Sequence, residues 1–204
     1  MKPNILIAFY SRTGHTQKLA EAIADGVESL GIHSAVLRIL PPVRPSWKEA
    51  GDSIPDSGPM YATLEDLKSA DGLLLGSPTR FGNMAAPVQH FIESASQLWH
   101  NNTLINKPAG VFCSTGSLHG GQEATLLSMM TPLLHLGMIP VGIPYSEKDL
   151  METSSGGTPY GASHLAGGKG DKTITQEEKR LAAALGQRVS RIAQSLHPLF
   201  HLEA

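Results

Sequence analysis

The sequence has a single cysteine, Cys113, among its 204 residues. It therefore cannot form an internal disulfide, and this is typical of proteins in a reducing compartment. No apolar run approaches the roughly 20 residues that a membrane-spanning helix needs, and the first residues lack the pattern of a signal peptide. From these absences we expect a cytoplasmic protein that does not insert into a membrane.

The sequence also lacks a large charge of either sign. Its 16 Lys and Arg residues nearly balance its 18 Asp and Glu residues, which leaves a net charge of -2. No cluster of basic residues attracts a nucleic acid, so we expect no such partner. The nine histidines contain no H-E-x-x-H pattern and have no cysteines clustered near them. We therefore expect no metal site.

Five short apolar segments are predicted to form strands, and the amphipathic segments between them are predicted to form helices. Thr63 and Thr175 are each followed three residues later by an acidic residue, which predicts two capped helix starts. Pro132 lies within a helical pattern and is expected to kink or divide that helix. The expected strands are residues 4–10, 34–40, 72–77, 108–114 and 138–143.

The alternation of strands and helices predicts one doubly wound, three-layer α/β domain over residues 1–204, with a five-stranded parallel sheet in the order 2-1-3-4-5. Two long segments, about 41–60 and 144–172, are expected to be insertions, because they exceed ordinary connections. Ligands of such sheets bind beyond the carboxyl ends of the strands, between the first and third strands. Three loops rich in Ser, Thr, Gly and Asn follow strands at this point.

The first of these loops has the composition of a phosphate site. It joins a buried strand to an amphipathic helix, so free backbone N–H groups and the positive end of a helix dipole converge there. Neither the nucleotide-hydrolysing pattern G-x-x-x-x-G-K-[ST] nor the dinucleotide pattern G-x-G-x-x-G is present. Instead, the pattern S-x-T-G-x-T resembles the phosphate loop of the flavodoxins. The loop consists of Ser11, Arg12, Thr13, Gly14, His15 and Thr16.

Three further motifs resemble the WrbA family of flavodoxin-like NAD(P)H:quinone oxidoreductases. They are PTRFGNM at 78–84, STG at 114–116 with GGQE at 120–123, and GGTPYGA at 156–162. The resemblance runs from the first strand to the last helix, and it implies a flavodoxin-like fold that binds flavin mononucleotide (FMN). It also implies a homotetramer whose active sites include walls from neighbouring subunits.

The resemblance further implies roles for individual residues. The six residues of the first loop would hold the phosphate, and two other loops would border the isoalloxazine ring. Phe81 and Trp99 would line the substrate side, and His135 would lie near the flavin. The ring-bordering residues would be Pro78, Thr79, Arg80, Phe81, Gly82, Asn83, Ser114, Thr115, Gly116, Ser117, Leu118, Gly120 and Gly121.

The expected activity is a ping-pong hydride relay, in which NADH or NADPH reduces the flavin, leaves, and a quinone then takes both electrons. Two alternatives remain open. A flavodoxin-type electron carrier would share the phosphate loop but exchange single electrons with protein partners. Such carriers tend to be strongly acidic, and the near-neutral charge of this chain favours the enzyme. The family's historical name suggests a repressor-associated binding protein, although no residue pattern here encodes that role.

Overall fold

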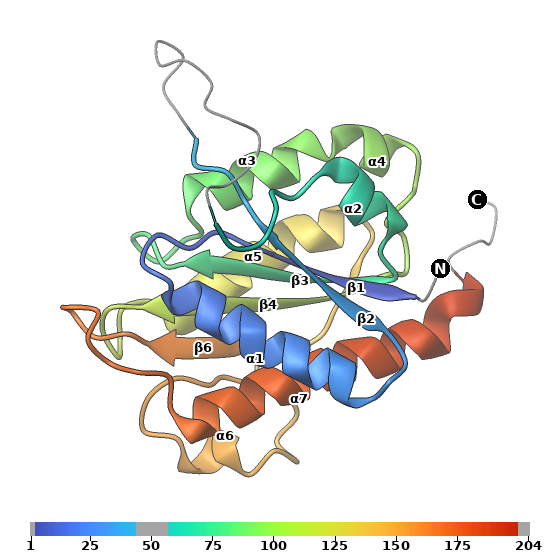
Figure 1. Cartoon of the computed structure of the whole chain (residues 1–204). Coiled ribbons are helices and arrows are strands. Elements are labelled where there is room, and N and C mark those ends of the chain that lie inside the picture. Colours follow the sequence, from blue (N-terminus) through green and yellow to red (C-terminus); the bar gives the residue numbers. More distant parts are fainter. Residues whose placement is uncertain (1–2, 44–56, 200–204) are drawn as a thin grey trace.

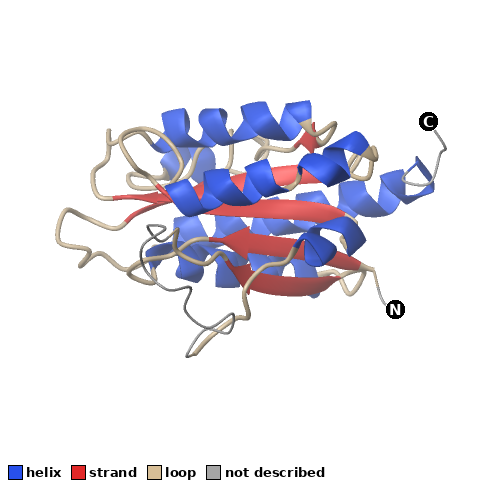
Figure 2. Ribbon diagram, turned by 90° about the horizontal axis from the view of Figure 1, so that it is seen from above, coloured by secondary structure: helices blue, strands red, loops and turns tan. Residues whose placement is uncertain are grey.

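In the computed structural model, which describes residues 3–43 and 57–199, a parallel sheet lies between two layers of helices (Figure 1). Figure 2 shows the strands with helices in front of them and behind them. The strand order β2-β1-β3-β4-β5 is the predicted one, so the doubly wound α/β fold is confirmed. The strands are β1 (Asn4–Phe9), β2 (Ser34–Ile39), β3 (Gly72–Pro78), β4 (Pro108–Thr115), β5 (Ile139–Pro140) and β6 (Ala162–Leu165).

Helices cover both faces of the sheet because the central strands bury side chains on both sides. In β1, Ile5 and Ile7 pack with α1 and α7, whereas Leu6 and Ala8 belong to the core on the opposite face. The helices are α1 (His15–Ser29), α2 (Leu64–Ser69), α3 (Ala86–Ser94), α4 (Ser96–His100), α5 (Gln122–His135), α6 (Asp149–Glu152) and α7 (Gln176–Leu196), followed by a short 3-10 turn, η1 (His197–Leu199).

The fifth strand position differs from the prediction. Only Ile139 and Pro140 pair there, with the first residues of β4. The chain then leaves the sheet through α6 and returns as β6, which pairs in parallel with Phe112 to Thr115 at the other end of β4. The expected insertion 144–172 therefore contributes a helix and a strand of its own. Most of the other expected insertion, 41–60, lies outside the described residues.

Local sequence signals place several helix ends as predicted. Thr63 and Thr175 each form a capping box, with Asp66 and Glu178 respectively. Pro132 does not divide α5, which continues to His135. Within residues 3–43 and 57–199, none of the helices combines the length and the apolar character needed to cross a bilayer.

Candidate functional site

The first wall of the candidate site is the start of α1. Gly14 has a φ of +84°, the left-handed conformation that glycine adopts without strain, and its N–H donates to Ser11 Oγ at 3.1 Å. Among the described residues, no side chain caps this helix, and its first turn contains no acidic residue. The amides of that turn and the positive end of the helix dipole are therefore available to an anion.

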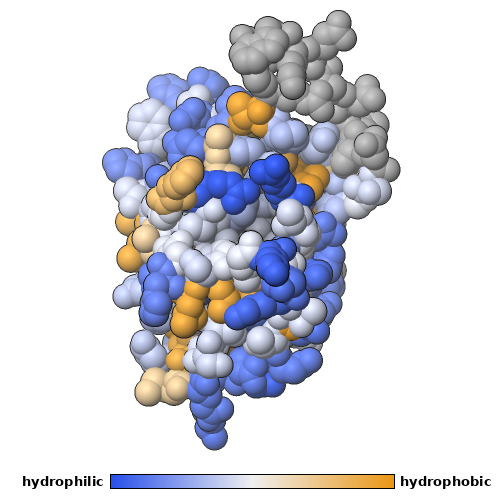
Figure 3. Space-filling view, turned by 90° about the vertical axis from the view of Figure 1, so that its left-hand side faces the viewer, coloured by the Kyte–Doolittle hydropathy of each residue, from blue (hydrophilic) through white to orange (hydrophobic). Residues whose placement is uncertain are grey.

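A pocket of about 440 Å³ lies beside this helix start, at the carboxyl end of the sheet. Figure 3 views this end of the molecule, whose middle is hollowed and of intermediate hydropathy. Thr16 and Ser114 both line the pocket, with their hydroxyl oxygens 2.9 Å apart. The structure brings together these predicted residues in the pocket: Ser11, Arg12, Thr13, Thr16, Pro78, Thr79, Arg80, Ser114, Thr115 and Gly116.

One wall of the pocket was not predicted from the sequence. It is the segment that follows β6, in which Ala166 N–H donates to Thr115 O at 2.8 Å and Lys172 N–H donates to Ala166 O at 3.0 Å. The glycine-rich pattern G-G-K-G was the available signal, because glycine lets a backbone approach a ligand closely. This wall, called the 166–170 wall below, consists of Ala166, Gly167, Gly168, Lys169 and Gly170.

The loop after β3 makes a tight turn that displays an aromatic ring. Arg80 N–H donates to Asn83 O at 2.8 Å, and Asn83 N–H donates back to Arg80 O at 3.0 Å. Between them Phe81 has a φ of +53° and Gly82 a φ of +77°. A left-handed backbone is uncommon for a residue with a side chain, and such conformations gather at functional sites. The phenyl ring of Phe81 is fully exposed.

The loop after β4 packs directly against this turn. A Cβ atom on Gly121 would lie only 2.9 Å from Gly82 Cα, so these two backbones meet in a way that a larger residue would prevent. Gly121 also has a φ of +92° and precedes α5, which again lacks a side-chain cap among the described residues. Thr125 Oγ1 donates to Thr79 Oγ1 at 3.2 Å and ties the two loops together. The helix start of α5 is thus held beside the pocket.

Other predicted site residues do not line the pocket itself. His135 and Asn83 line a separate groove of about 320 Å³ along α5. Trp99 lies on α4 with 56% of its surface exposed. Ligand contact by these residues stays a prediction. The residues outside the pocket lining are Gly14, His15, Phe81, Gly82, Asn83, Ser117, Leu118, Gly120, Gly121, His135 and Trp99.

The lone cysteine is unreactive at neutral pH. Cys113 is fully buried in β4, and this burial raises the pKa of its thiol to about 12. Its Sγ donates to Gln122 O at 3.5 Å. Because the thiolate is the reactive form, Cys113 stays an inert thiol at neutral pH. In the part of the chain that the structure describes, no group of three His, Cys, Asp or Glu side chains could hold a metal ion.

The pocket has the properties that the phosphate end of FMN requires. Uncapped helix amides and hydroxyl groups suit a dianion, and the side chains of Arg12 and Lys169 add positive charge at the rim. The volume falls within the roughly 300–1,000 Å³ of pockets that hold small molecules. The residues present therefore fit the cofactor.

Comparisons with known proteins agree with this geometry. A family model described as NADPH-dependent FMN reductase matches residues 1–147. A relative named NAD(P)H dehydrogenase (quinone) from Trichlorobacter lovleyi is 42% identical, over 94% of this chain and 98% of the relative. A relative of the same name from Solidesulfovibrio magneticus is 39% identical, over 95% and 98%.

Solved structures support the fold. A flavodoxin, WrbA-like protein from Agrobacterium tumefaciens superposes with a TM-score of 0.68 at 21% identity, covering 95% of this chain and 98% of that chain. These findings confirm the resemblance that the motifs indicated. The chain belongs to the NADPH-dependent FMN reductase family.

Proposed function

We propose that the chain binds FMN in the pocket at the start of α1 and is an NAD(P)H:quinone oxidoreductase. The observation that carries the proposal is the uncapped start of α1 facing a hydroxyl-lined pocket at the carboxyl end of the sheet. The names of the relatives, which share about 40% of the sequence over nearly its full length, support the activity.

The residues of the chain would bind and orient, and the cofactor would carry the redox chemistry. Bound FMN supplies two-electron transfer between a nicotinamide and a quinone. The α1 amides and the hydroxyls of Ser11, Thr13 and Thr16 hold the phosphate. The loops after β3 and β4 border the ring, where their N–H groups stabilise negative charge. The exposed ring of Phe81 offers a flat apolar surface on which a nicotinamide or quinone can stack.

A homotetramer is part of the proposal. Large apolar side chains are exposed on α4, the turn after it and α5, among them Trp99 (56%), Ile105 (39%) and Leu134 (59%). Apolar groups of this size are typical of surfaces that contact another protein. Sedimentation of the FMN-loaded protein as a tetramer is the expected result, and sedimentation as a monomer would contradict it. A cytoplasmic location stays a prediction.

An absorption experiment tests the activity. The purified protein is loaded with FMN, and NADH or NADPH is added, followed by benzoquinone. We expect the flavin absorbance to fall on addition of a nicotinamide and to recover on addition of the quinone. Sustained oxidation of nicotinamide should require the quinone. If the FMN-loaded protein transfers electrons from neither nicotinamide to the quinone, the proposed activity is wrong.

A further inference from the structure

Two buried histidines lie side by side behind the phosphate pocket. His15 is the first residue of α1 and is 9% exposed, and His164 in β6 is fully buried. Their ring centroids are 5.4 Å apart, and the ring planes are inclined by 33°. Among the described residues, His15 Nδ1 and His164 Nε2 have no hydrogen-bond partner. Buried polar atoms normally have partners, so this pair calls for an explanation.

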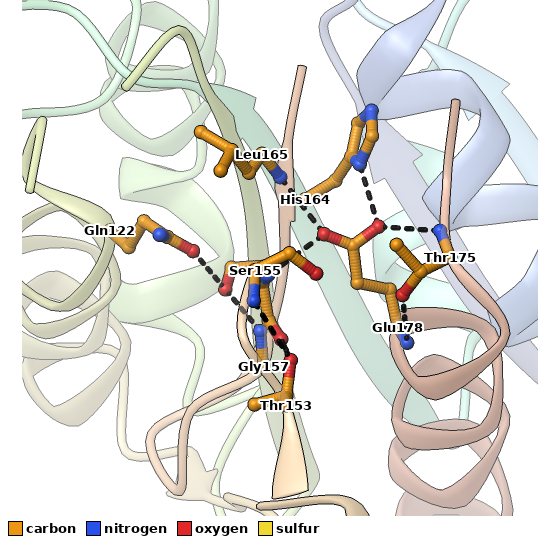
Figure 4. Close-up of polar contacts among 10 residues, drawn as sticks. Gln122, Thr153, Ser155, Gly157, His164, Leu165, Thr175 and Glu178 are labelled. Atoms are coloured by element: carbon orange, nitrogen blue, oxygen red, sulfur yellow. Dashed lines mark hydrogen bonds and ion pairs between the residues drawn. The ribbon is translucent and has the colours of Figure 1, made fainter. Parts of the chain in front are cut away.

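His164 is held by a buried carboxylate at the start of α7 (Figure 4). Glu178 Oε2 accepts from His164 Nδ1 at 2.8 Å, and the carboxylate also accepts N–H groups of Gly156, Leu165 and Thr175. Burial by itself raises the pKa of Glu178, but these hydrogen bonds outweigh it and leave the pKa below its ordinary value. Glu178 is therefore ionised and accepts a hydrogen bond from His164 Nδ1, which leaves His164 Nε2 as the ring atom without a partner among the described residues.

His15 is arranged in a similar way. Its Nε2 faces the backbone of Gly170 in the 166–170 wall, since a Cβ atom there would lie 3.2 Å from it. Burial, followed by the repulsion that a protonated His164 and Lys18 would exert, lowers the pKa of His15, and a hydrogen bond with the Gly170 backbone opposes this effect. With Nε2 used for that bond, Nδ1 presents a lone pair. The two rings together offer two proton-accepting atoms in a site that is shielded from solvent.

The charges around the pair determine when it accepts a proton. Lys18 on α1, Arg12 and Lys169 at the pocket rim and the positive end of the α1 dipole all disfavour a further cation. Glu178 on α7 is the one acidic group in contact with the pair among the described residues, and it favours a cation on His164. A dianion bound at the start of α1 would change the sign of the local field and favour protonation strongly.

We propose that an anion in the pocket draws one proton from solvent onto the His15–His164 pair, at His15 Nδ1 or His164 Nε2, and that the charged pair then supports the bound phosphate. Glu178 acts as a positioning residue that holds His164 against His15. The inference rests on the proposed function in one respect, because the anion is taken to be the phosphate of FMN.

Proton uptake has a definite consequence for affinity. The pair has a lower pKa without the anion and a higher pKa with the anion bound. If binding adds a proton, the affinity for FMN falls as pH rises from the lower to the higher of these two values. For one proton the dissociation constant rises by about tenfold per pH unit in that range. Riboflavin, which lacks the phosphate, should show no such dependence.

Titration calorimetry measures the proton directly. FMN is titrated at about pH 7.5, where a phosphate with a second pKa near 6 is already mostly dianionic, in two buffers of different ionisation enthalpy. We expect a substantial fraction of a proton to be taken up with FMN and none with riboflavin. Any contribution from the phosphate itself would be proton release, which has the opposite sign.

Two variants assign the proton to the pair. His164→Asn keeps a donor for Glu178 at the position of Nδ1, and His15→Gln keeps a donor for Gly170 at the position of Nε2, but neither can be protonated. The variant that removes the proton-accepting ring should bind FMN with greatly reduced proton uptake, whereas His90→Asn, at an exposed histidine of α3, should behave as the wild type.

The outcomes separate this inference from the proposed function. No binding of FMN at any pH would contradict the proposed function. FMN binding without proton uptake in the wild type would overturn the inference alone. Equal uptake with riboflavin, or full uptake retained in both variants, would also overturn it. If a variant does not fold, the wild-type comparison of FMN with riboflavin still decides.

Discussion

The pocket has two walls of different origin, one at the start of α1 and one at residues 166–170. The first is built by neighbours in the chain, such as Ser11 and Gly14, which are three residues apart. The second depends on Glu178, which accepts N–H groups from Gly156 and Leu165 and is buried with its partners. The comparison shows that one wall of the candidate pocket is encoded by one short motif, whereas the other wall depends on a carboxylate farther along the chain.

Removing the Glu178 carboxylate should have the largest effect on the difference between the two walls. Glu178→Ala leaves two buried N–H donors, one partly buried N–H donor and His164 Nδ1 without their acceptor. We expect a loss of about 3–5 kcal/mol in the free energy of unfolding, because each buried donor left without an acceptor costs roughly 1–3 kcal/mol. Denaturant unfolding followed by circular dichroism measures it. The matched control is Glu177→Ala, whose exposed ion pair with Arg180 contributes little to stability because water screens it. Equal losses in both variants would contradict the role of Glu178.

Acid should weaken the 166–170 wall through the same residue. The folded-state pKa of Glu178 lies below its ordinary value, so its contribution is fully present above the unfolded pKa of about 4.3 and is lost as pH falls through the lower folded value. We expect Glu178→Gln to show a flatter decline in unfolding free energy over this range than the wild type. Denaturant melts at a series of acidic pH values test this, and parallel curves would show that other carboxylates govern the decline.

The α1 wall should respond in binding more than in stability. Thr16→Ala removes a hydroxyl that lies 2.9 Å from Ser114 Oγ and faces the pocket. We expect the affinity for FMN to fall about ten- to hundredfold, because a hydrogen bond to a charged group contributes roughly 1.5–3 kcal/mol. Fluorescence quenching of FMN measures the change. Thr131→Ala, at an exposed position of α5, is the control, and an unchanged affinity in Thr16→Ala would place the phosphate elsewhere.

The smallest expected effect belongs to Lys169. Its side chain is exposed at the rim of the 166–170 wall, where its charge is screened by water and salt. We expect Lys169→Ala to weaken FMN binding by about threefold at low salt and hardly at all at high salt. Lys179→Ala, at an exposed position of α7, serves as the matched control. A large effect that persists at high salt would mean that Lys169 contacts the phosphate directly.

The sequence predicted the features that depend on neighbouring residues. The strand order follows from the alternation of apolar segments, and the pocket wall at the start of α1 follows from a contiguous run of Ser, Thr and Gly. Thr175 and Glu178 were recognised as a capping box, and they form one. The second role of Glu178, as acceptor for β6, has no local signature, because its partners in space are not periodic in the chain.

The missed strand has the same physical cause. β6 contains Ser163 and His164, which are polar and yet buried. They can be buried because Gln122 and Glu178, 41 and 14 residues away, accept hydrogen bonds from Ser163 Oγ and His164 Nδ1. An interpretation based on the hydrophobic pattern therefore finds no strand there and treats the segment as part of an insertion. The 166–170 wall was missed together with the strand that positions it.

The turn that displays Phe81 has a consequence for how the chain can evolve. A left-handed backbone costs a residue with a side chain about 1–2 kcal/mol, and a fully exposed ring regains nothing by burial in the described chain. Glycine at this position would relieve the backbone strain and stabilise the fold, but it would also remove the flat apolar surface of the Phe81 ring. Under the proposed function, selection for stability and selection for catalytic turnover therefore act in opposite directions at this single position.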